Sequence, residues 1–136
     1  MTNVKPFMKP EDFDWTLPPG WNRTKGYLED ALEYERGLYT LDDVLASIRS
    51  KELQFWPADK SALVTQIVQH PRDRQLDFWL AGGDLDELKQ LAAFVESWAV
   101  QREGVTCAKI TGRRGWLILG DEWEEIATVM VKRLDK

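Results

Sequence analysis

The amino-acid sequence predicts an α/β (α+β) domain with a mixed, mostly antiparallel sheet and helices on both faces. Three observations lead to this prediction. Two short segments, 27–36 and 40–48, come first and have the apolar spacing of helices. A β-rich stretch then reverses direction at 70–73, which indicates an antiparallel hairpin. A long amphipathic helix next leads into a further strand, and such a strand–helix–strand unit makes a right-handed parallel crossover.

The two early helices carry end signals. The first is expected to end at Gly37, which suits a left-handed cap, and the second to begin at Thr40 as its N-cap. Asp42 and Asp43 then lie in the first turn, where the helix dipole favours acidic groups. A short strand over 53–57 follows and is stopped by its own proline.

The second half of the chain supplies the remaining elements. The hairpin is expected to pair 62–69 with 74–81, and strict alternation along 74–81 places Leu76, Phe78 and Leu80 on one face. Asp84 is a suitable N-cap for the longest helix, which Gly104 ends. We expect three further segments: a strand over 105–111, a tight loop over 112–115 and a last strand over 123–132.

Residues 1–25 are predicted to form an extended arm rich in proline and aromatic residues, and residues 26–136 a single domain. The arm contains several large apolar side chains, so it is expected to lie against a surface. Two interpretations follow: the arm packs on its own domain, or it docks on a partner.

Composition excludes several classes of function. The net charge is −5, from 18 basic and 23 acidic side chains, so we expect no nucleic-acid binding. No apolar run is long enough to cross a bilayer, and the first residues lack the order of a signal peptide. A single cysteine, Cys107, fits a reducing compartment, and with only one histidine we expect no metal site.

Four segments together resemble a family of small GNAT-like (acetyltransferase-fold) proteins that tailed phages and prophages encode near their head and tail genes. The likeness extends over roughly residues 27–132. Its two most specific signatures are LAGGDLDEL and TGRRGW. The segments are Tyr27 to Tyr34, Gln54 to Pro57, Trp79 to Leu88 and Ile110 to Trp116. The resemblance implies the GNAT fold and a phage context, and it defines the activity less closely.

The resemblance also implies where a cofactor would bind. In GNAT enzymes the loop before the long helix holds the pyrophosphate of acetyl-CoA, with the pattern Arg/Gln-x-x-Gly-x-Gly/Ala. Here Gly82 and Gly83 are present, but no Arg or Gln precedes them, and carboxylates occupy the first turn of the helix, beginning with Asp84. Two interpretations follow: the helix caps itself and takes no cofactor, or Arg113 and Arg114 fold across the site and bind the phosphates.

No catalytic residue is assigned. Acetyl transfer uses a carboxylate or His base and often a Tyr acid, but every Tyr lies between residues 27 and 39. Asp77 in a predicted strand either faces a cleft or pairs with a basic residue. The remaining candidates have plainer interpretations as solvated charges, a turn residue, a structural thiol and a ring with no useful proton: Glu124, Glu125, His70, Cys107 and Trp116.

Three functions fit these observations. The first is a non-catalytic GNAT-fold protein that acts in virion assembly or as a virion-associated component, with a phage structural or host protein as partner and no cofactor. The second is an acyl-CoA-dependent N-acetyltransferase that uses acetyl-CoA on a host or phage amine. The third is a small regulator that binds a host protein. In each case the chain is expected in the host cytoplasm, and under the first hypothesis also in the virion.

Overall fold

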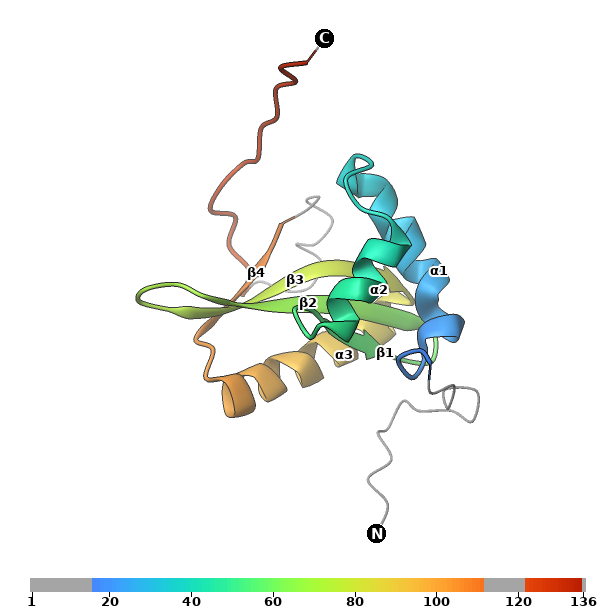
Figure 1. The fold of residues 1–136 in the computed structure, drawn as a ribbon. Coiled ribbons are helices and arrows are strands. Elements are labelled where there is room, and N and C mark those ends of the chain that lie inside the picture. The colour runs from blue at the N-terminus through green and yellow to red at the C-terminus, as the bar shows by residue number, and fades with distance from the viewer. Residues whose placement is uncertain (1–15, 112–121, 136) are drawn as a thin grey trace.

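The computed structural model describes residues 16–111 and 122–135. A four-stranded sheet lies at the centre of these residues, with helices on either side of it (Figure 1). A short 3₁₀ turn, Glu33–Glu35, follows the first helix, and a π-helical turn, Ala99–Glu103, extends the last one. The main elements in chain order are α1 (Trp21–Leu32), α2 (Leu41–Arg49), β1 (Gln54–Pro57), β2 (Ser61–Gln69), β3 (Arg74–Gly83), α3 (Leu85–Trp98) and β4 (Cys107–Ile110).

The sheet is mixed and mostly antiparallel, as the sequence predicts. Its strand order is β1-β2-β3-β4. The β1–β2 and β2–β3 pairs are antiparallel, whereas β4 lies parallel to β3 after the crossover through α3. The turn that joins β2 to β3 contains an exposed His70, whose amide donates to the Asp73 carbonyl at 2.7 Å. The predicted hairpin and crossover are therefore both confirmed.

A β-bulge in β3 changes the faces that its side chains occupy. Val64 pairs with Leu80 while the next residue, Thr65, pairs with Phe78, so Trp79 is the extra residue. Because of the bulge, Trp79 and Leu80 both contact the core under α1, whereas Phe78 belongs to the core under α3. The prediction that Leu80 shares a face with Phe78 is wrong for this reason.

Two apolar cores lie on opposite faces of the sheet, which confirms helices on both faces. The core under α3 combines residues of β2 and β3 with the apolar side of the helix, and its largest fully buried members are Leu63, Leu76, Leu91 and Val95. The core under α1 and α2 includes Trp21, Leu28, Val44 and Leu80.

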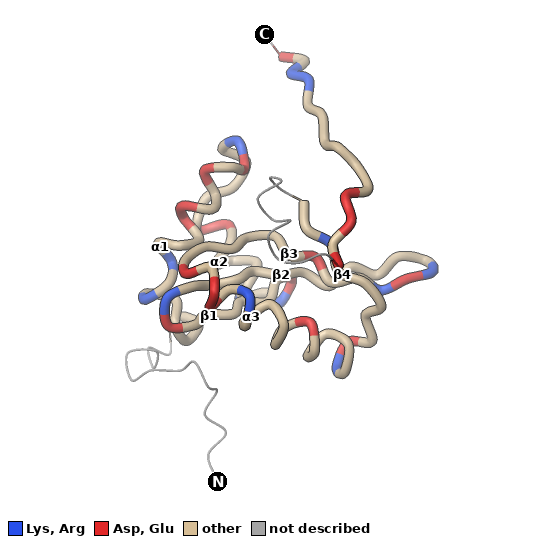
Figure 2. Tube along the Cα trace, turned by 180° about the vertical axis from the view of Figure 1, so that it is seen from behind, with Lys and Arg blue, Asp and Glu red and all other residues tan. Residues whose placement is uncertain are grey.

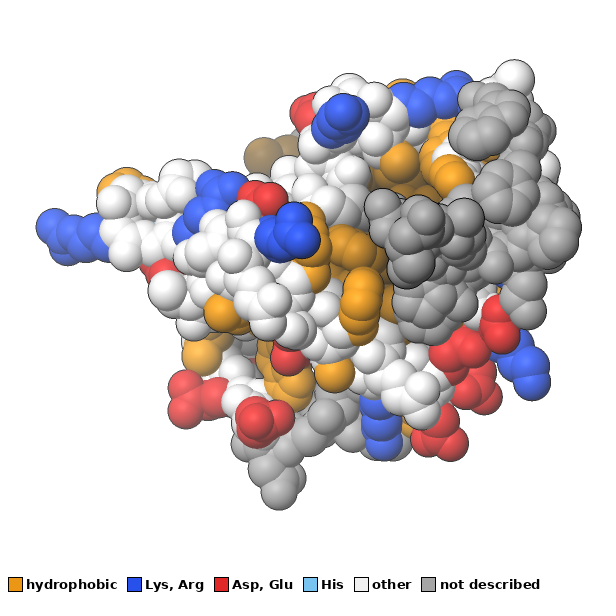
Figure 3. Space-filling model, turned by 90° about the horizontal axis from the view of Figure 1, so that it is seen from below, with side chains coloured by type: hydrophobic (Ala, Val, Ile, Leu, Met, Phe, Trp, Pro, Cys, Tyr) orange, Lys and Arg blue, Asp and Glu red, His pale blue; other side chains and the backbone are white. Residues whose placement is uncertain are grey.

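The helix α3 also leaves some apolar surface in solvent. Seen from the α3 side of the molecule, apolar side chains are exposed between charged ones (Figure 3). Phe94 of α3 is one exposed apolar residue, and its ring packs edge-on against Trp56 with 6.2 Å between ring centroids.

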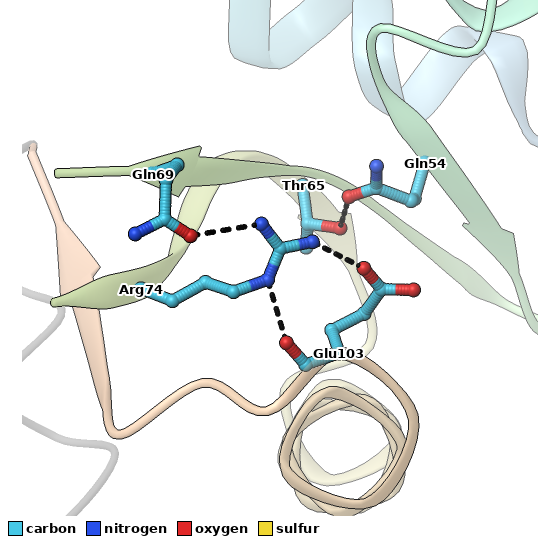
Figure 4. A network of polar contacts seen from close by, with 5 residues as sticks. All are labelled: Gln54, Thr65, Gln69, Arg74 and Glu103. Carbon is cyan, nitrogen blue, oxygen red and sulfur yellow. Dashed lines mark hydrogen bonds and ion pairs between the residues drawn. The ribbon is translucent and has the colours of Figure 1, made fainter.

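The end of the α3 segment is tied to the sheet by a polar network (Figure 4). Arg74 Nε donates to the Glu103 carbonyl at 2.6 Å, and its Nη2 contacts the Glu103 carboxylate at 2.7 Å. Arg74 Nη1 also donates to Gln69 Oε1 at 3.2 Å. Nearby, Thr65 donates to Gln54 Oε1 at 3.0 Å. The two Arg74–Glu103 contacts hold the end of the π-helical turn against the start of β3, at the point where the chain leaves α3 for β4.

The first helix begins earlier than predicted. α1 starts at Trp21, so residues 21–25, which the sequence analysis placed in an extended arm, are helical. Pro18 and Pro19 stop a helix before this point but not after it. Trp21 is buried and packs on Phe55 with ring centroids 5.5 Å apart, and this tertiary contact holds the early turn. The rest of the arm, residues 1–15, lies outside the described residues.

The second helix follows its sequence signals. Thr40 is the N-cap of α2, and its hydroxyl accepts from the Asp43 amide at 3.2 Å. The Asp43 carboxylate in turn accepts from the Thr40 amide at 2.8 Å, which completes a capping box. These hydrogen bonds lower the pKa of Asp43. Gly37 has a φ of 72°, the left-handed conformation predicted for it.

The last predicted strand is wrong. No strand is assigned within residues 122–135, and every side chain from 124 to 135 is exposed. The segment has the alternation of a strand, but among the described residues no neighbouring strand pairs with it. Trp123 alone in this stretch is half-buried and contacts Phe78 at 6.2 Å between ring centroids. The predicted loop over 112–115 falls outside the described residues.

Gly82 and Gly26 offer a matched test of this packing. A Cβ at Gly82 would lie 2.5 Å from the Tyr27 carbonyl oxygen, whereas a Cβ at Gly26 would meet nothing within 4 Å. We expect Gly82→Ala to lower the free energy of unfolding by about 1–3 kcal/mol, because the backbones must separate. Gly26→Ala should raise it by about 0.5–1 kcal/mol, as an Ala inside a helix does. Urea denaturation measures both, and equal effects would contradict the close approach of α1 to β3.

Candidate functional site

The candidate site lies where β3 and β4 part. The two strands pair only from Gln75 with Cys107 to Phe78 with Ile110, and β3 then continues to Gly83. The bulge at Trp79 is the first residue beyond the last pair. β4 ends at Ile110, and beyond this point none of the described residues pairs with β3 on its β4 side.

A pocket of about 450 Å³ lies beside this end of β3. It is bordered by α1 and the turn after it, by β3 and by the residue that follows β4. Its lining residues in the described part of the chain are Tyr27, Asp30, Ala31, Tyr34, Glu35, Trp79, Leu80, Ala81, Gly82, Gly83 and Thr111.

Two tyrosines of the pocket come from α1 and the turn that follows it. The spacing of Tyr27, Ala31 and Tyr34 brings all three to the pocket side of this segment. The sequence analysis assigned no tyrosine as a catalytic acid, because every Tyr lies between residues 27 and 39. It did not predict that α1 lies against the end of β3, which brings Tyr27 and Tyr34 to the pocket. The helical spacing of these two residues is the sequence signal that places them on one side of α1.

The charged side chains among the described lining residues of the pocket are acidic. Trp79 donates its indole N–H to Glu35 Oε1 at 2.9 Å, and the Tyr39 ring packs edge-on against Trp79 at 4.8 Å. Asp30 supplies a second carboxylate, and no Lys or Arg is among the described lining residues. Carboxylates beside aromatic rings attract cations, so the described part of the pocket suits an ammonium group.

A second hollow of about 670 Å³ lies at the other end of the sheet, between the loop before β1 and the end of α3. Arg74 and Glu103 both line it, but their charges are already paired with each other at 2.7 Å. Lys51 and Glu52 also line it, so it carries charges of both signs, whereas the described lining of the first pocket carries acidic charges alone.

The junction between β3 and α3 does not form a phosphate-binding loop. A single residue, Asp84, separates the end of β3 from the start of α3. Its amide donates to the Lys60 carbonyl at 2.9 Å. A pyrophosphate site needs several free amides at a helix N-terminus, and this junction is too short to turn a set of them outward.

The two glycines at this junction are explained by contacts within the protein. A side chain at Gly82 would meet the backbone of Tyr27 in α1. Gly83 has a φ of 113° and lies against the backbone of Lys60 and Ser61 in the β1–β2 turn. Glycine is required at both positions because two backbones approach each other there.

The acidic first turn of α3 binds its own neighbours. Asp84 caps the helix, as the sequence predicts, and accepts from the Glu87 amide at 2.9 Å. Glu87 Oε1 accepts from the Lys60 amide at 2.7 Å and from the Ser61 hydroxyl at 2.5 Å. The Glu87 amide is thus already hydrogen-bonded, and the carboxylates of Asp84, Asp86 and Glu87 repel an anion. The described residues of this junction therefore do not fit the pyrophosphate of acetyl-CoA.

The remaining sequence candidates lie away from the pocket or outside the described residues. Asp77 pairs across the sheet with Lys109 at 3.7 Å and accepts from Gln75 Nε2 at 2.6 Å, so the ion-pair interpretation is the one that the structure supports. Glu124 and Glu125 are exposed, in agreement with their interpretation as solvated charges. Arg113, Arg114 and Trp116 lie outside the described residues.

Cys107 is half-buried at the start of β4. Its thiol donates to Asp73 Oδ2 at 3.1 Å, and Asp73 also accepts from the Thr106 hydroxyl. The hydrogen bond to the carboxylate raises the pKa of the Cys107 thiol, with burial and charge repulsion as further causes. The hydrogen bonds from Thr106 and Cys107 lower the pKa of Asp73. Because the thiolate is the nucleophile, a raised thiol pKa makes Cys107 less reactive than an ordinary cysteine.

In the ranges 16–111 and 122–135, no group of three or more His, Cys, Asp and Glu side chains is placed to hold a metal ion. No helix of those ranges is long and apolar enough to cross a membrane.

Comparison with known proteins shows the class of fold. No family model matches the chain, and no curated protein matches it. Solved structures do match it, among them a tetramutant of the BH1408 protein from Bacillus halodurans, with a TM-score of 0.57, 12% identity, and 78% of this chain and 86% of that chain covered. The aminoglycoside acetyltransferase meta-AAC0020, from an uncultured soil metagenomic sample, has a TM-score of 0.57 and 8% identity, with 79% and 86% covered. The chain therefore has a GNAT-like, acetyltransferase-type fold.

The environment of Cys107 gives a prediction about reactivity. Because the Asp73 carboxylate raises the thiol pKa, alkylation by iodoacetamide at pH 8 should be slower in the folded protein than in the same protein unfolded in urea. Asp73→Asn removes the charge and should speed the folded reaction. Alkylation rates followed by mass spectrometry measure both, and equal rates in folded and unfolded protein would contradict the assignment.

Proposed function

We propose that this chain is a non-catalytic GNAT-fold protein that acts in phage virion assembly or as a virion-associated component. The observation that carries the proposal is the β3–α3 junction, where one residue connects strand and helix and its amide is bonded to Lys60 at 2.9 Å. A GNAT enzyme needs this position for its cofactor.

Two physical effects at the junction support the loss of cofactor binding. Asp84 and Glu87 satisfy donors within the protein, so a phosphate would have to displace existing hydrogen bonds. Asp86 adds a further carboxylate to the first turn, and a phosphate would be repelled by all three. A fold whose cofactor position is closed can still serve as a scaffold, because fold and function separate in evolution.

The phage context rests on the sequence resemblance, in which LAGGDLDEL and TGRRGW occur together. Under this proposal the chain is made in the host cytoplasm, and its partner is a phage structural protein or a host protein. No cofactor is needed for such a role.

The second candidate is an acyl-CoA-dependent N-acetyltransferase acting on a host or phage amine. The pocket favours it, because Asp30 and Glu35 beside Tyr27 and Tyr34 suit an amine. For this function Arg113 and Arg114 would have to supply the phosphate contacts that the β3–α3 junction does not offer.

Titration calorimetry with acetyl-CoA and with CoA separates the two candidates. We expect no heat of binding at millimolar ligand, because the amides of Asp84 and Glu87 are hydrogen-bonded within the protein and three carboxylates repel a phosphate. Micromolar binding that is lost in the Arg113→Ala/Arg114→Ala variant would overturn the proposal and establish the second candidate.

A separate experiment tests the role in the particle. The chain should be detected by mass spectrometry in purified particles of the phage or prophage that encodes it, or its deletion should lower the yield of complete particles. Particles that lack the chain and form in normal yield after deletion of its gene would contradict the assembly role.

A further inference from the structure

β2 is longer than the edge strand that pairs with it. β1 pairs with β2 only as far as Gln54 with Thr65, whereas β2 continues to Gln69 toward the projecting hairpin (Figure 1). The chain before β1 bends away to the end of α2, where the Glu52 amide donates to the Ser47 carbonyl at 3.0 Å. Among the described residues, no strand therefore pairs with the last part of β2 on its β1 side.

The backbone groups of Ile67 and Gln69 point to this open edge. In a strand the N–H and C=O of one residue point to the same side, and successive residues alternate. The Ser61 carbonyl accepts from the amide that follows β1 at 2.8 Å, whereas the His70 amide donates across the hairpin turn to the Asp73 carbonyl at 2.7 Å. The extra residue of the bulge belongs to β3, so the alternation along β2 is unbroken. Odd-numbered residues of β2 therefore face the β1 side.

The hollow of about 670 Å³ borders the open edge, and both Ile67 and Gln69 line it. On one side of it lies the loop before β1, which contributes Lys51, and on the other lies the end of the α3 segment, which contributes Trp98 and Glu103. Its volume is within the range of about 300–1,000 Å³ that is typical of ligand sites. The open backbone groups are therefore next to a space that a ligand can occupy.

Two unusual backbone conformations border the same hollow. Lys51 has a φ of 69°, a left-handed conformation that is uncommon outside glycine. The chain from Ala99 to Glu103 forms a π-helical turn, and such turns are frequent at functional sites. The Arg74 guanidinium contacts the carbonyl and the carboxylate of Glu103 at 2.6 and 2.7 Å (Figure 4). This side of the hollow is therefore held in a defined position.

The charges around the hollow favour a ligand without strong net charge. Lys51 and Glu52 carry opposite charges, and Arg74 pairs with Glu103, so the charged groups of the described lining sum to zero. Figure 2 shows the same mixture of signs along the β2–β3 hairpin and at the end of the α3 segment. A polyanion gains no net attraction from such a lining. The hydrogen-bonding groups of the open edge are left to select the ligand.

We propose that the open edge of β2 binds an extended peptide segment of a partner protein, which adds to the sheet as a short strand in line with β1. Ile67 and Gln69 each offer an N–H and a C=O, in the order that an extended peptide backbone matches. The side chains of Ile67 and Trp98 both pack against the core under α3. A peptide residue opposite Ile67 has its side chain on that face, so an apolar residue is favoured there.

The inference does not rest on the proposed function, since it uses neither the pocket beside α1 nor the β3–α3 junction. Hydrogen exchange of the chain alone tests whether the edge is open. The amides of Ile67 and Gln69 should exchange at least about tenfold faster than those of Gln66 and Val68, which point to β3. Equal protection of all four amides would show that the edge is already covered and would overturn the proposal.

Peptides selected from a random heptapeptide display library against the immobilised full chain test binding. Gln69→Pro should bind them about tenfold more weakly than Gln69→Ala. Both variants lack the Gln side chain, but only proline removes the N–H on the open edge, and it leaves the hydrogen bonds to β3 in place.

Methylation of the peptide amides keeps the test valid if Gln69→Pro does not fold, because it uses the wild-type chain. Methyl groups at alternate peptide positions should weaken binding, whereas those at the positions between them should not. Calorimetry measures both series. A selection that yields no binder, equal affinity for Gln69→Pro and Gln69→Ala, or a methylation series without this alternation would each contradict strand addition.

Discussion

The close approach of β3 to its two neighbours at Gly82 and Gly83 is the contact on which the candidate site depends. At Gly82 the backbone of α1 lies where a side chain would be, and this brings the tyrosines of α1 to the end of β3. At Gly83 the β1–β2 turn does the same, and the chain passes into α3 after one more residue. The same two glycines therefore line the pocket and bring β3 against α1 and the start of β2.

The bulge at Trp79 is the second determinant. It turns two successive side chains toward α1, so the core under α1 gains Leu80 while Trp79 reaches Glu35 at 2.9 Å. It also lies immediately beyond the last β3–β4 pair, where the parallel strands part. The inserted residue Trp79 therefore contributes both to the core under α1 and to the lining of the pocket. Bulges are common next to functional sites.

Most of the fold could be predicted from local sequence signals, and the errors arise where tertiary contacts decide. The Thr40 and Asp84 caps, the hairpin turn and the α3 crossover all follow from short patterns. The early start of α1 depends on the burial of Trp21, and the face of Leu80 on a bulge, neither of which has a local signal. For the site, the sequence singled out Gly82 and Gly83 as cofactor-binding residues, whereas the contacts between backbones that require glycine there could be seen only in the structure. The prediction of a last strand over 123–132 was wrong, because alternation of apolar residues does not ensure a neighbouring strand to pair with, and none of the described strands pairs with it.

The described residues form a GNAT-like fold with a pocket beside the end of β3 and an acidic junction between β3 and α3. At this junction the amides of Asp84 and Glu87 donate within the protein. Amide hydrogen exchange by NMR measures this directly at Asp84 and Glu87. The account predicts strong protection of both amides, with rates and chemical shifts unchanged by added CoA, because they donate to Lys60 and Asp84. Rapid exchange of these amides, together with shifts that move on addition of CoA, would contradict it.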